Sequence, residues 1–402
     1  GYMQNKKIKA SNVPNLRFIE FNEQWKKSKL KSVANIYDGT HQTPDYKQAG
    51  IPFISVEDIS NINKTTKFIT KEAYDKDFKI RPEYGDVFMT RIGDIGTPAI
   101  MDTRDNLSYY VSLALIKIKG RLTSYFLYSF IQSIHFQREL WKRTIHVAFP
   151  RKINKNEIGE CFISFPSINE QEKISTFIST IDKRIKTQSK IIKEKEYQKE
   201  LISISILKDS NLFESNIKLS ELADFYNGYA FDSKDYEQNG KYNVITIGNV
   251  TGERNINIIK SNKVNSLPTD IRDYQILHKG DILISMTGNV GRVSICNSEN
   301  CLLNQRVGKI KPKSENLNEY IYQCISNNLF EKKMILKGQG AAQINISKNN
   351  ILDFQMPFTK NIENINYYSK LMHSFDKTIE IEKLLLSKHY VVKKYLLKKL
   401  FI

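Results

Sequence analysis

The sequence predicts an α+β protein made of two globular modules in tandem, each followed by one long helix. Two observations lead to this prediction: the second half of the chain repeats the first, and the hydrophobic pattern of each half changes near its end. With 402 residues, the chain is long enough for two or three domains that each bury a core of their own.

The repeat is seen in several segments that recur in the same order at nearly constant spacing. KLKSVANIYDG, which begins at Lys29, returns as KLSELADFYNG at Lys218. GDVFMTRIGDIG, from Gly85, returns as GDILISMTGNVG from Gly280, and later INKNEIGECFISFP and FISTIDKRI return as ISKNNILDFQMP and MHSFDKTI. Such order indicates duplication of one ancestral half, and two copies predict a pseudo-twofold object with two similar modules.

The first part of each half predicts a mixed module. Short runs rich in β-branched and aromatic residues, such as IPFISV, GDVFMT and YNVITIG, are separated by Gly, Asn and Asp turn signals. One amphipathic helix is predicted near Ser124 to Trp141, and its counterpart near Asn318 to Leu336. Strands and helices of this kind indicate an α+β module.

The last part of each half predicts a long helix. Apolar residues recur there at alternating steps of about four and three positions, which is the heptad seam of a coiled coil. Because the first helix joins the modules and the second ends the chain, we expect an antiparallel pair, the alternative being that each helix folds back on its own module. The expected helix-pair or partner interface is Ile174, Ile178, Ile181, Ile185, Ile192, Met372, Phe375, Ile379 and Leu386.

These patterns give the expected boundaries. We expect a flexible N-terminus with a cloning remnant at 1–15, modules at 16–166 and 210–357, and long helices at 167–209 and 358–402.

The charge favours a polyanionic partner. Lysine and arginine number 61 against 43 acidic residues, a net charge of +18, with 34 against 23 in residues 1–207 and 27 against 20 in 208–402. Nucleic acid is the leading partner and an anionic membrane surface the second. No apolar run reaches the roughly 18 residues of a membrane span, and four scattered cysteines fit a reducing cytoplasm.

Catalytic and metal-binding motifs are not recognisable. No Gly-x-x-x-x-Gly-Lys-Ser/Thr loop occurs, and GQGAAQ from Gly338 lacks the third glycine of a dinucleotide fingerprint. The six histidines show no metal-ligand spacing. We therefore expect no catalytic residue, no metal and no cofactor on this chain.

Three pairs of polar loops predict DNA contacts. The first pair is 37–46 and 226–236, the second is 90–96 and 285–291, and the third is 146–154 and 338–347. Each pair keeps its flanks between the copies while its contents change, which suits a reader of two different sequences. Glycines let the backbone approach a ligand, basic side chains hold phosphates, and Gln pairs with adenine. The expected DNA-binding residues are Thr40, His41, Gln42, Thr43, Arg91, Asp94, His146, Arg151 and Lys152 in the first half, and Tyr229, Phe231, Ser233, Thr287, Asn289, Arg292, Gln339 and Gln343 in the second.

Together these features resemble one known family. The GTHQTP loop, the GD(V/I)(F/L) strand with its IGDIG or TGNVG turn, the GQGAAQINIS segment, and FP or MP before a long helix are similar to those of the DNA specificity subunits of type I restriction-modification systems. The resemblance covers 16–402, and HVAFPR replaces the glycine-rich GAAQ in the first copy.

The resemblance implies a non-catalytic subunit with two target recognition domains. Each domain would read one half of a split, asymmetric double-stranded DNA sequence, and the helical pair would set the unread spacer. Two modification subunits with S-adenosylmethionine would methylate adenine, and restriction subunits would use ATP and Mg²⁺ to translocate and cut. A nuclease or methyltransferase with an unfamiliar site, and a stand-alone two-headed DNA-binding regulator without enzyme partners, remain as alternatives.

Overall fold

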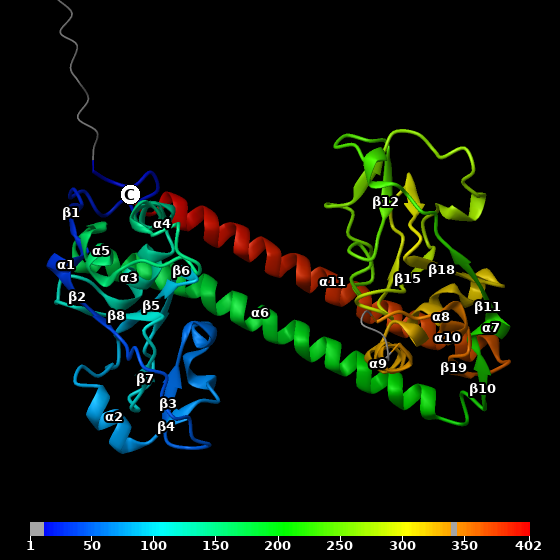
Figure 1. Ribbon diagram of the computed structural model, residues 1–402, viewed down its shortest axis with the longest axis horizontal. Coiled ribbons are helices and arrows are strands. Elements are labelled where there is room, and N and C mark those ends of the chain that lie inside the picture. Colours follow the sequence, from blue (N-terminus) through cyan, green and yellow to red (C-terminus); the bar gives the residue numbers. More distant parts are fainter. Residues whose placement is uncertain (1–11, 339–343) are drawn as a thin grey trace, which may run out of the picture. The chain divides into compact units, whose positions relative to one another are not determined.

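The computed structural model describes residues 12–338 and 344–402. The chain divides into two compact units, one formed by Gly1–Ser189 together with Leu385–Ile402, and one formed by Lys190–Leu384 (Figure 1). Each unit holds one α+β module and parts of two long helices, α6 (Ile168–Lys208) and α11 (Ile362–Lys399). The predicted tandem of mixed modules with long helices is therefore the observed architecture.

The first module is built on a four-stranded antiparallel sheet in the order β2-β8-β5-β6. A smaller sheet, β4-β3-β7, and the two-stranded ladder β1-β9 complete it. The elements of this module are β1 (Lys26–Lys29), α1 (Leu30–Val33), β2 (Ala34–Asp38), β3 (Ile51–Ile54), β4 (Phe68–Ile69), α2 (Lys71–Asp77), β5 (Val87–Ile92), β6 (Asp94–Ile100), β7 (Ser108–Tyr109), β8 (Leu113–Ile118), α3 (Ser124–Ile131), α4 (Ile134–Arg143), α5 (Lys155–Glu160) and β9 (Phe162–Phe165).

The second module repeats this topology with one added strand, β14, in its smaller sheet. Its main sheet has the order β11-β18-β15-β16, its smaller sheet β13-β12-β17-β14, and its two-stranded ladder is β10-β19. The elements are β10 (Ser215–Lys218), α7 (Leu219–Leu222), β11 (Ala223–Asn227), β12 (Tyr242–Ile245), β13 (Asn262–Val264), β14 (Ile276–Leu277), β15 (Ile282–Ser285), β16 (Val293–Ile295), β17 (Cys301–Leu303), β18 (Val307–Pro312), α8 (Asn318–Ile325), α9 (Asn328–Lys337), α10 (Lys348–Leu352) and β19 (Gln355–Phe358).

The amphipathic helix predicted in each module is two helices. The side chain of Ser133 accepts a hydrogen bond from the backbone N–H of Phe136 and starts α4, and Asn327 accepts from Phe330 to start α9. These N-caps satisfy donors that a continuous helix would bond to preceding carbonyls, so the chain turns at each cap. The prediction of one helix was wrong because the hydrophobic period continues across the turn.

Two matching glycines follow strands where another backbone segment comes close. A Cβ on Gly39 would lie 2.3 Å from the carbonyl oxygen of Tyr109, and one on Gly228 would lie 2.2 Å from that of Asn304. No side chain fits in that space, so the YDG and YNG motifs hold glycine for packing.

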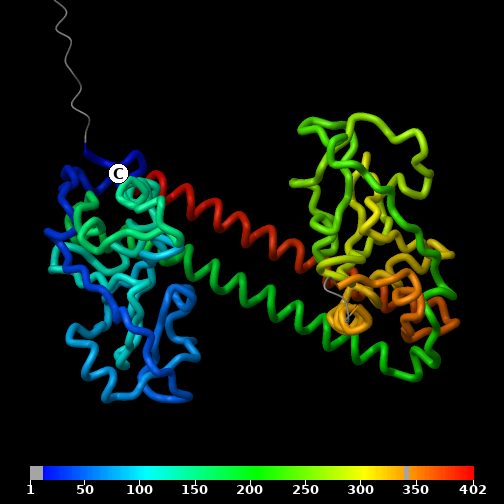
Figure 2. Tube along the Cα trace, in the orientation of Figure 1, coloured from blue at the N-terminus to red at the C-terminus, as the bar shows by residue number. Residues whose placement is uncertain are grey.

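The core of the first unit includes the C-terminal end of the chain. Ile174 and Ile178 of α6 are buried in it, and Leu400 and Phe401 pack beside Trp25 in the same cluster. Figure 2 shows this end of the chain, in red, returning to the blue and cyan module. In the second unit, Tyr368 and Met372 of α11 are buried in the corresponding core.

Candidate nucleic-acid interface

A buried ion pair gathers the predicted loops of the first module. Arg91 Nη1 donates to Asp38 Oδ1 at 2.8 Å and to the carbonyl oxygen of Val111 at 3.1 Å, and Arg91 Nε donates to that of Ile153 at 3.0 Å. Asp38 ends β2, Arg91 lies near the end of β5, and Ile153 lies in the third predicted loop. Loops that lie far apart in the sequence therefore meet at one guanidinium.

This geometry gives Arg91 a positioning role. Its side chain is 7% exposed, and its hydrogen bonds point into the module. Contact with DNA would require the guanidinium to leave these partners, so the predicted contact stays a prediction that this arrangement does not favour.

The first predicted loop presents its polar side chains to solvent. Thr40 is held by backbone bonds: its N–H donates to Tyr109, and its carbonyl accepts from Val111 at 2.9 Å. The next three residues, His41, Gln42 and Thr43, are exposed, so their side chains can reach a ligand.

The second and third loops of the first module are joined through their backbones. The N–H of Gly93 donates to the carbonyl of Arg151 at 2.8 Å, and that of Ile145 donates to the carbonyl of Lys152 at 2.8 Å. Asp94, Arg151 and Lys152 are exposed. The second and third predicted loops of this module are thus held together at the end of β5.

An aromatic residue orders the third loop. The rings of Trp141 and His146 lie with their centroids 4.3 Å apart, and His146 Nε2 lies 3.0 Å from the Trp141 carbonyl oxygen. The Arg151 guanidinium lies over the Trp141 ring at 5.4 Å. These contacts hold the stem of the loop while Arg151 stays exposed to solvent.

In the second module, the first loop carries an aromatic cluster. The repeat places Tyr229 at the position of Thr40, and its hydroxyl donates to Asp270 at 2.7 Å. Its ring meets that of Phe231 with centroids 4.9 Å apart, and exposed Ser233 begins a short 3-10 turn. Stacking surfaces of this kind suit bases or sugars of nucleic acid.

The structure adds residues that the sequence analysis did not select. Tyr274 stacks on Tyr226 at 4.8 Å, and the Arg272 guanidinium lies 5.9 Å from the Tyr274 ring. Together with Asp270, they bring the segment before β14 to the first loop. This segment is not part of the matched repeat, so only its mix of basic and aromatic residues, IRDY, signalled a role.

The remaining loops of the second module pair as in the first. The N–H of Gly288 donates to the Ile344 carbonyl at 3.1 Å, and Thr287 forms an isolated β-bridge with Asn345. Asn289 is exposed and its carbonyl accepts from Ser285 Oγ, while Arg292 Nε lies 3.4 Å from Glu331 Oε1. Gln339 and Gln343 lie outside the described residues.

The second turn glycine of GDIG and of GNVG serves packing. A Cβ on Gly96 would meet the side chain of Gln137 at 2.6 Å, and one on Gly291 would meet that of Met334 at 2.8 Å. Because glycine has no side chain at these two positions, helices α4 and α9 can pack against the turns.

Most of the predicted helix-interface residues pack into the cores of the two modules. Ile174, Ile178, Ile181 and Ile185 contact the core of the first module, and Met372 and Phe375 contact that of the second. Ile192 and Ile379 are buried, and Leu386 is half-buried. Within the second unit, α6 and α11 run antiparallel, since Glu196, Lys199 and Ser203 contact Lys383, Asp376 and Tyr368 in reverse order.

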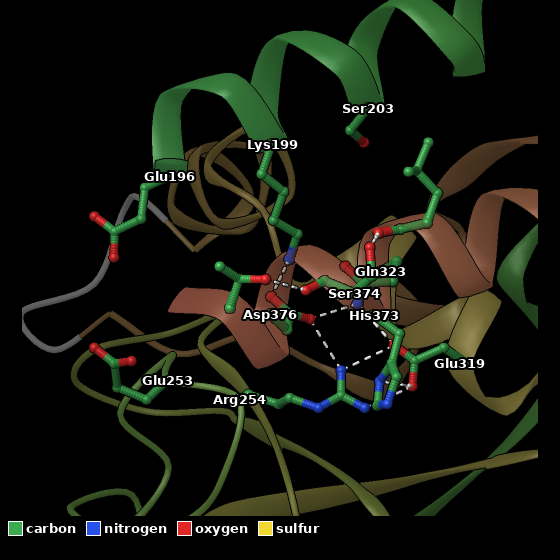
Figure 3. A network of polar contacts seen from close by, with 12 residues as sticks. Glu196, Lys199, Ser203, Glu253, Arg254, Glu319, Gln323, His373, Ser374 and Asp376 are labelled. Carbon is green, nitrogen blue, oxygen red and sulfur yellow. Dashed lines mark hydrogen bonds and ion pairs between the residues drawn. The ribbon is translucent and has the colours of Figure 1, made fainter. Parts of the chain in front are cut away.

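A polar network holds the second module to both helices (Figure 3). Arg254 pairs with Glu319 at 2.6 Å and with Asp376 at 3.0 Å, and Lys199 reaches Asp376 at 2.5 Å. Burial acts to lower the pKa of Arg254, but its bonds to Glu319 outweigh this and raise that pKa. Burial acts to raise the pKa of Glu319, but bonds from Arg254 and Gln323 leave it lowered.

Within residues 12–338 and 344–402, no group of three or more His, Cys, Asp or Glu residues is arranged to hold a metal ion. Among the helices described there, none has the length and apolar character needed to cross a bilayer.

The sequence matches the family described as the type I restriction modification DNA specificity domain, over residues 22–196 and again over 213–388. The chain belongs to this family. Each match covers one module and part of one long helix, so the duplication is a tandem of two specificity domains. The chain is thus of the specificity-subunit type, the non-catalytic component of a type I restriction-modification system.

Relatives agree with this membership. A Methanocaldococcus jannaschii protein, described as the specificity subunit of type I restriction enzyme MjaX, is 23% identical and is matched over 93% of this chain and 92% of its own length. A crystal structure of a type I restriction-modification S subunit from M. genitalium has a TM-score of 0.61 at 16% identity, covering 97% of this chain and 99% of that one. A structure reported for complex assembly and conformational transition of the type I R-M system has a TM-score of 0.53 at 13% identity, covering 93% and 96%.

Proposed function

We propose that this specificity subunit reads a bipartite, asymmetric double-stranded DNA target, with one module for each half-site. The observation that carries this proposal is the contrast between the loops. Their backbone bonds repeat, as in Gly93 to Arg151 and Gly288 to Ile344, whereas the exposed side chains differ. A shared frame with changed contents is what two readers of different sequences require.

The side chains suggest a division of labour within each module. Exposed His41, Gln42 and Asp94 in the first module, and Tyr229 and Arg272 in the second, have polar or aromatic groups suited to base edges. Arg151 and Lys152 add positive charge suited to phosphates, which supplies affinity that weakens with salt.

The partners and cofactors are part of the same proposal. Two modification subunits would bring S-adenosylmethionine and methylate adenine, and restriction subunits would bring ATP and Mg²⁺, all in the cytoplasm. α6 and α11 would set the spacer between half-sites, so that two weak readers gain affinity only at the correct separation. The comparisons offer no support for a stand-alone regulator.

The test is adenine-methylation mapping in cells that express this chain with its modification subunits. We expect one split motif in the wild type. Gln42→Ala should relax or abolish recognition of one half of that motif, and Arg272→Ala should do so for the other half.

Tyr197→Ala provides the control, because Tyr197 is exposed on α6 and should leave the motif unchanged. The proposal fails if the wild-type chain directs no methylation, or if both loop variants alter the same half.

A further inference from the structure

We propose that Phe149, at the tip of a rigid basic hairpin in the first module, inserts into the base stack of bound DNA. The inference rests on the proposed DNA-reading function, and it adds an apolar contact to a loop whose polar residues alone had been selected.

The hairpin presents an unusual amount of apolar surface. Val147 is 97% exposed and Phe149 is 104% exposed, so neither side chain packs against the module. Trp141, at 59%, adds to the same region through its contact with His146. Scattered exposed apolar residues are common, but a concentration in one short loop indicates a contact surface.

The stem of the hairpin is held firmly. Lys152 forms backbone β-bridges with Ile145 and with Ile92. The N–H of Ile153 donates to the carbonyl of Arg91 at 3.0 Å. A rigid base beneath an exposed ring means that little conformational entropy is lost when the ring inserts.

The charge around the tip selects nucleic acid as the occupant. Arg151 and Lys152 follow the tip closely in the chain, and among the residues that the structure describes no carboxylate is ion-paired with either one. The nearby carboxylate of Glu157 is paired with Arg143. An apolar wedge beside cations is an arrangement by which proteins unstack a base step while holding the adjoining phosphates.

The position of the hairpin agrees with this role. Its stem is bonded to the Gly93 turn, next to exposed Asp94, which is predicted to contact DNA. A ring inserted here would mark a fixed point on the first half-site, against which the polar side chains read their bases.

The test uses the full-length chain and a fluorescently labelled DNA duplex carrying the mapped target. Phe149→Ala should weaken binding by roughly tenfold, the loss expected for one stacked base. Its salt dependence should stay that of the wild type, whereas Arg151→Ala should reduce the salt slope by about one.

A direct readout comes from Phe149→Trp in a Trp141→Phe background. We expect DNA to quench the new tryptophan, because a stacked indole loses fluorescence to the bases. Tyr84→Trp in the same Trp141→Phe background is the matched control: Tyr84 is 63% exposed in the same unit beside Arg104, and DNA should leave the new tryptophan unquenched.

The outcomes separate the two proposals. Tight wild-type binding, with no quenching in the Phe149→Trp variant and unchanged affinity in Phe149→Ala, overturns the wedge alone. Loss of modification-subunit capture by Phe149→Ala, with DNA affinity unchanged, also overturns it in favour of a protein contact. A wild-type chain that binds no duplex, alone or with modification subunits, overturns the DNA-reading function itself.

Discussion

Lys199 of α6 lies 2.5 Å from Asp376 of α11, and the repeat provides its counterpart in Asp182 and Lys393, 2.7 Å apart. Asp182 and Asp376 occupy the same place in the IDKRI and FDKTI segments. In each unit the aspartate of that unit's own repeat therefore pairs with a lysine of the other copy's helix.

Asp376→Asn should destabilise the second unit by about 2–4 kcal/mol, because it leaves Arg254 and Lys199 without their shared, mostly buried carboxylate. Urea denaturation followed by circular dichroism measures this. Lys199→Met is the control and should lower the unfolding free energy by less, since Asp376 keeps its ion pair with Arg254. If both variants lose the same unfolding free energy, the ion pair between Arg254 and Asp376 does not stabilise the network.

Arg91→Met should lower the unfolding free energy of the first unit by about 2–4 kcal/mol and disturb recognition of its half-site, because Asp38 is left with only Lys155, at 3.6 Å. The aligned residues of the second copy are Asn227 and Met286. The double variant Asp38→Asn/Arg91→Met copies that pair, so it should recover most of the stability. A double variant less stable than Arg91→Met would contradict this reading.

Acid should weaken the second unit through Glu319. The pKa of Glu319 is lowered in the folded state, so its contribution is present above the unfolded pKa of about 4.3 and is lost as the pH falls through the lower folded value. Glu319→Gln should thus lower the urea midpoint at pH 7 and make it less sensitive to acid. An equal acid dependence in both proteins would exclude this role.

Gly228→Ala should destabilise its module by about 1–3 kcal/mol, because the added Cβ meets the backbone of Asn304. Gly93→Ala tests whether any loop glycine would do the same. Its Cβ would enter open space, leaving only the strain of a φ near 79°, about 1 kcal/mol. Thermal unfolding of both variants decides between packing and backbone conformation.

The sequence predicted the large features because they repeat. Duplicated strands, helices and loop frames leave matching letters, and the heptad seam signals each long helix. Features without a counterpart were missed. The Arg272–Tyr274 segment lies outside the matched repeat segments, and the pairing of Arg91 with Asp38 joins strands whose contact no local pattern reveals. Periodicity also hid the Ser133 and Asn327 caps, since apolar spacing continues through both turns.

The return of the C-terminal end to the first core has a consequence for synthesis on the ribosome. Leu396, Leu397, Leu400 and Phe401 complete a core whose other members precede Lys190. At about 5–20 residues per second, the intervening Lys190–Leu384 segment takes roughly 10–40 s to translate. The N-terminal module therefore waits, unfinished, while the second is made. A chain cut short by a premature stop codon never closes that core, and quality-control proteases receive it with its apolar interior open.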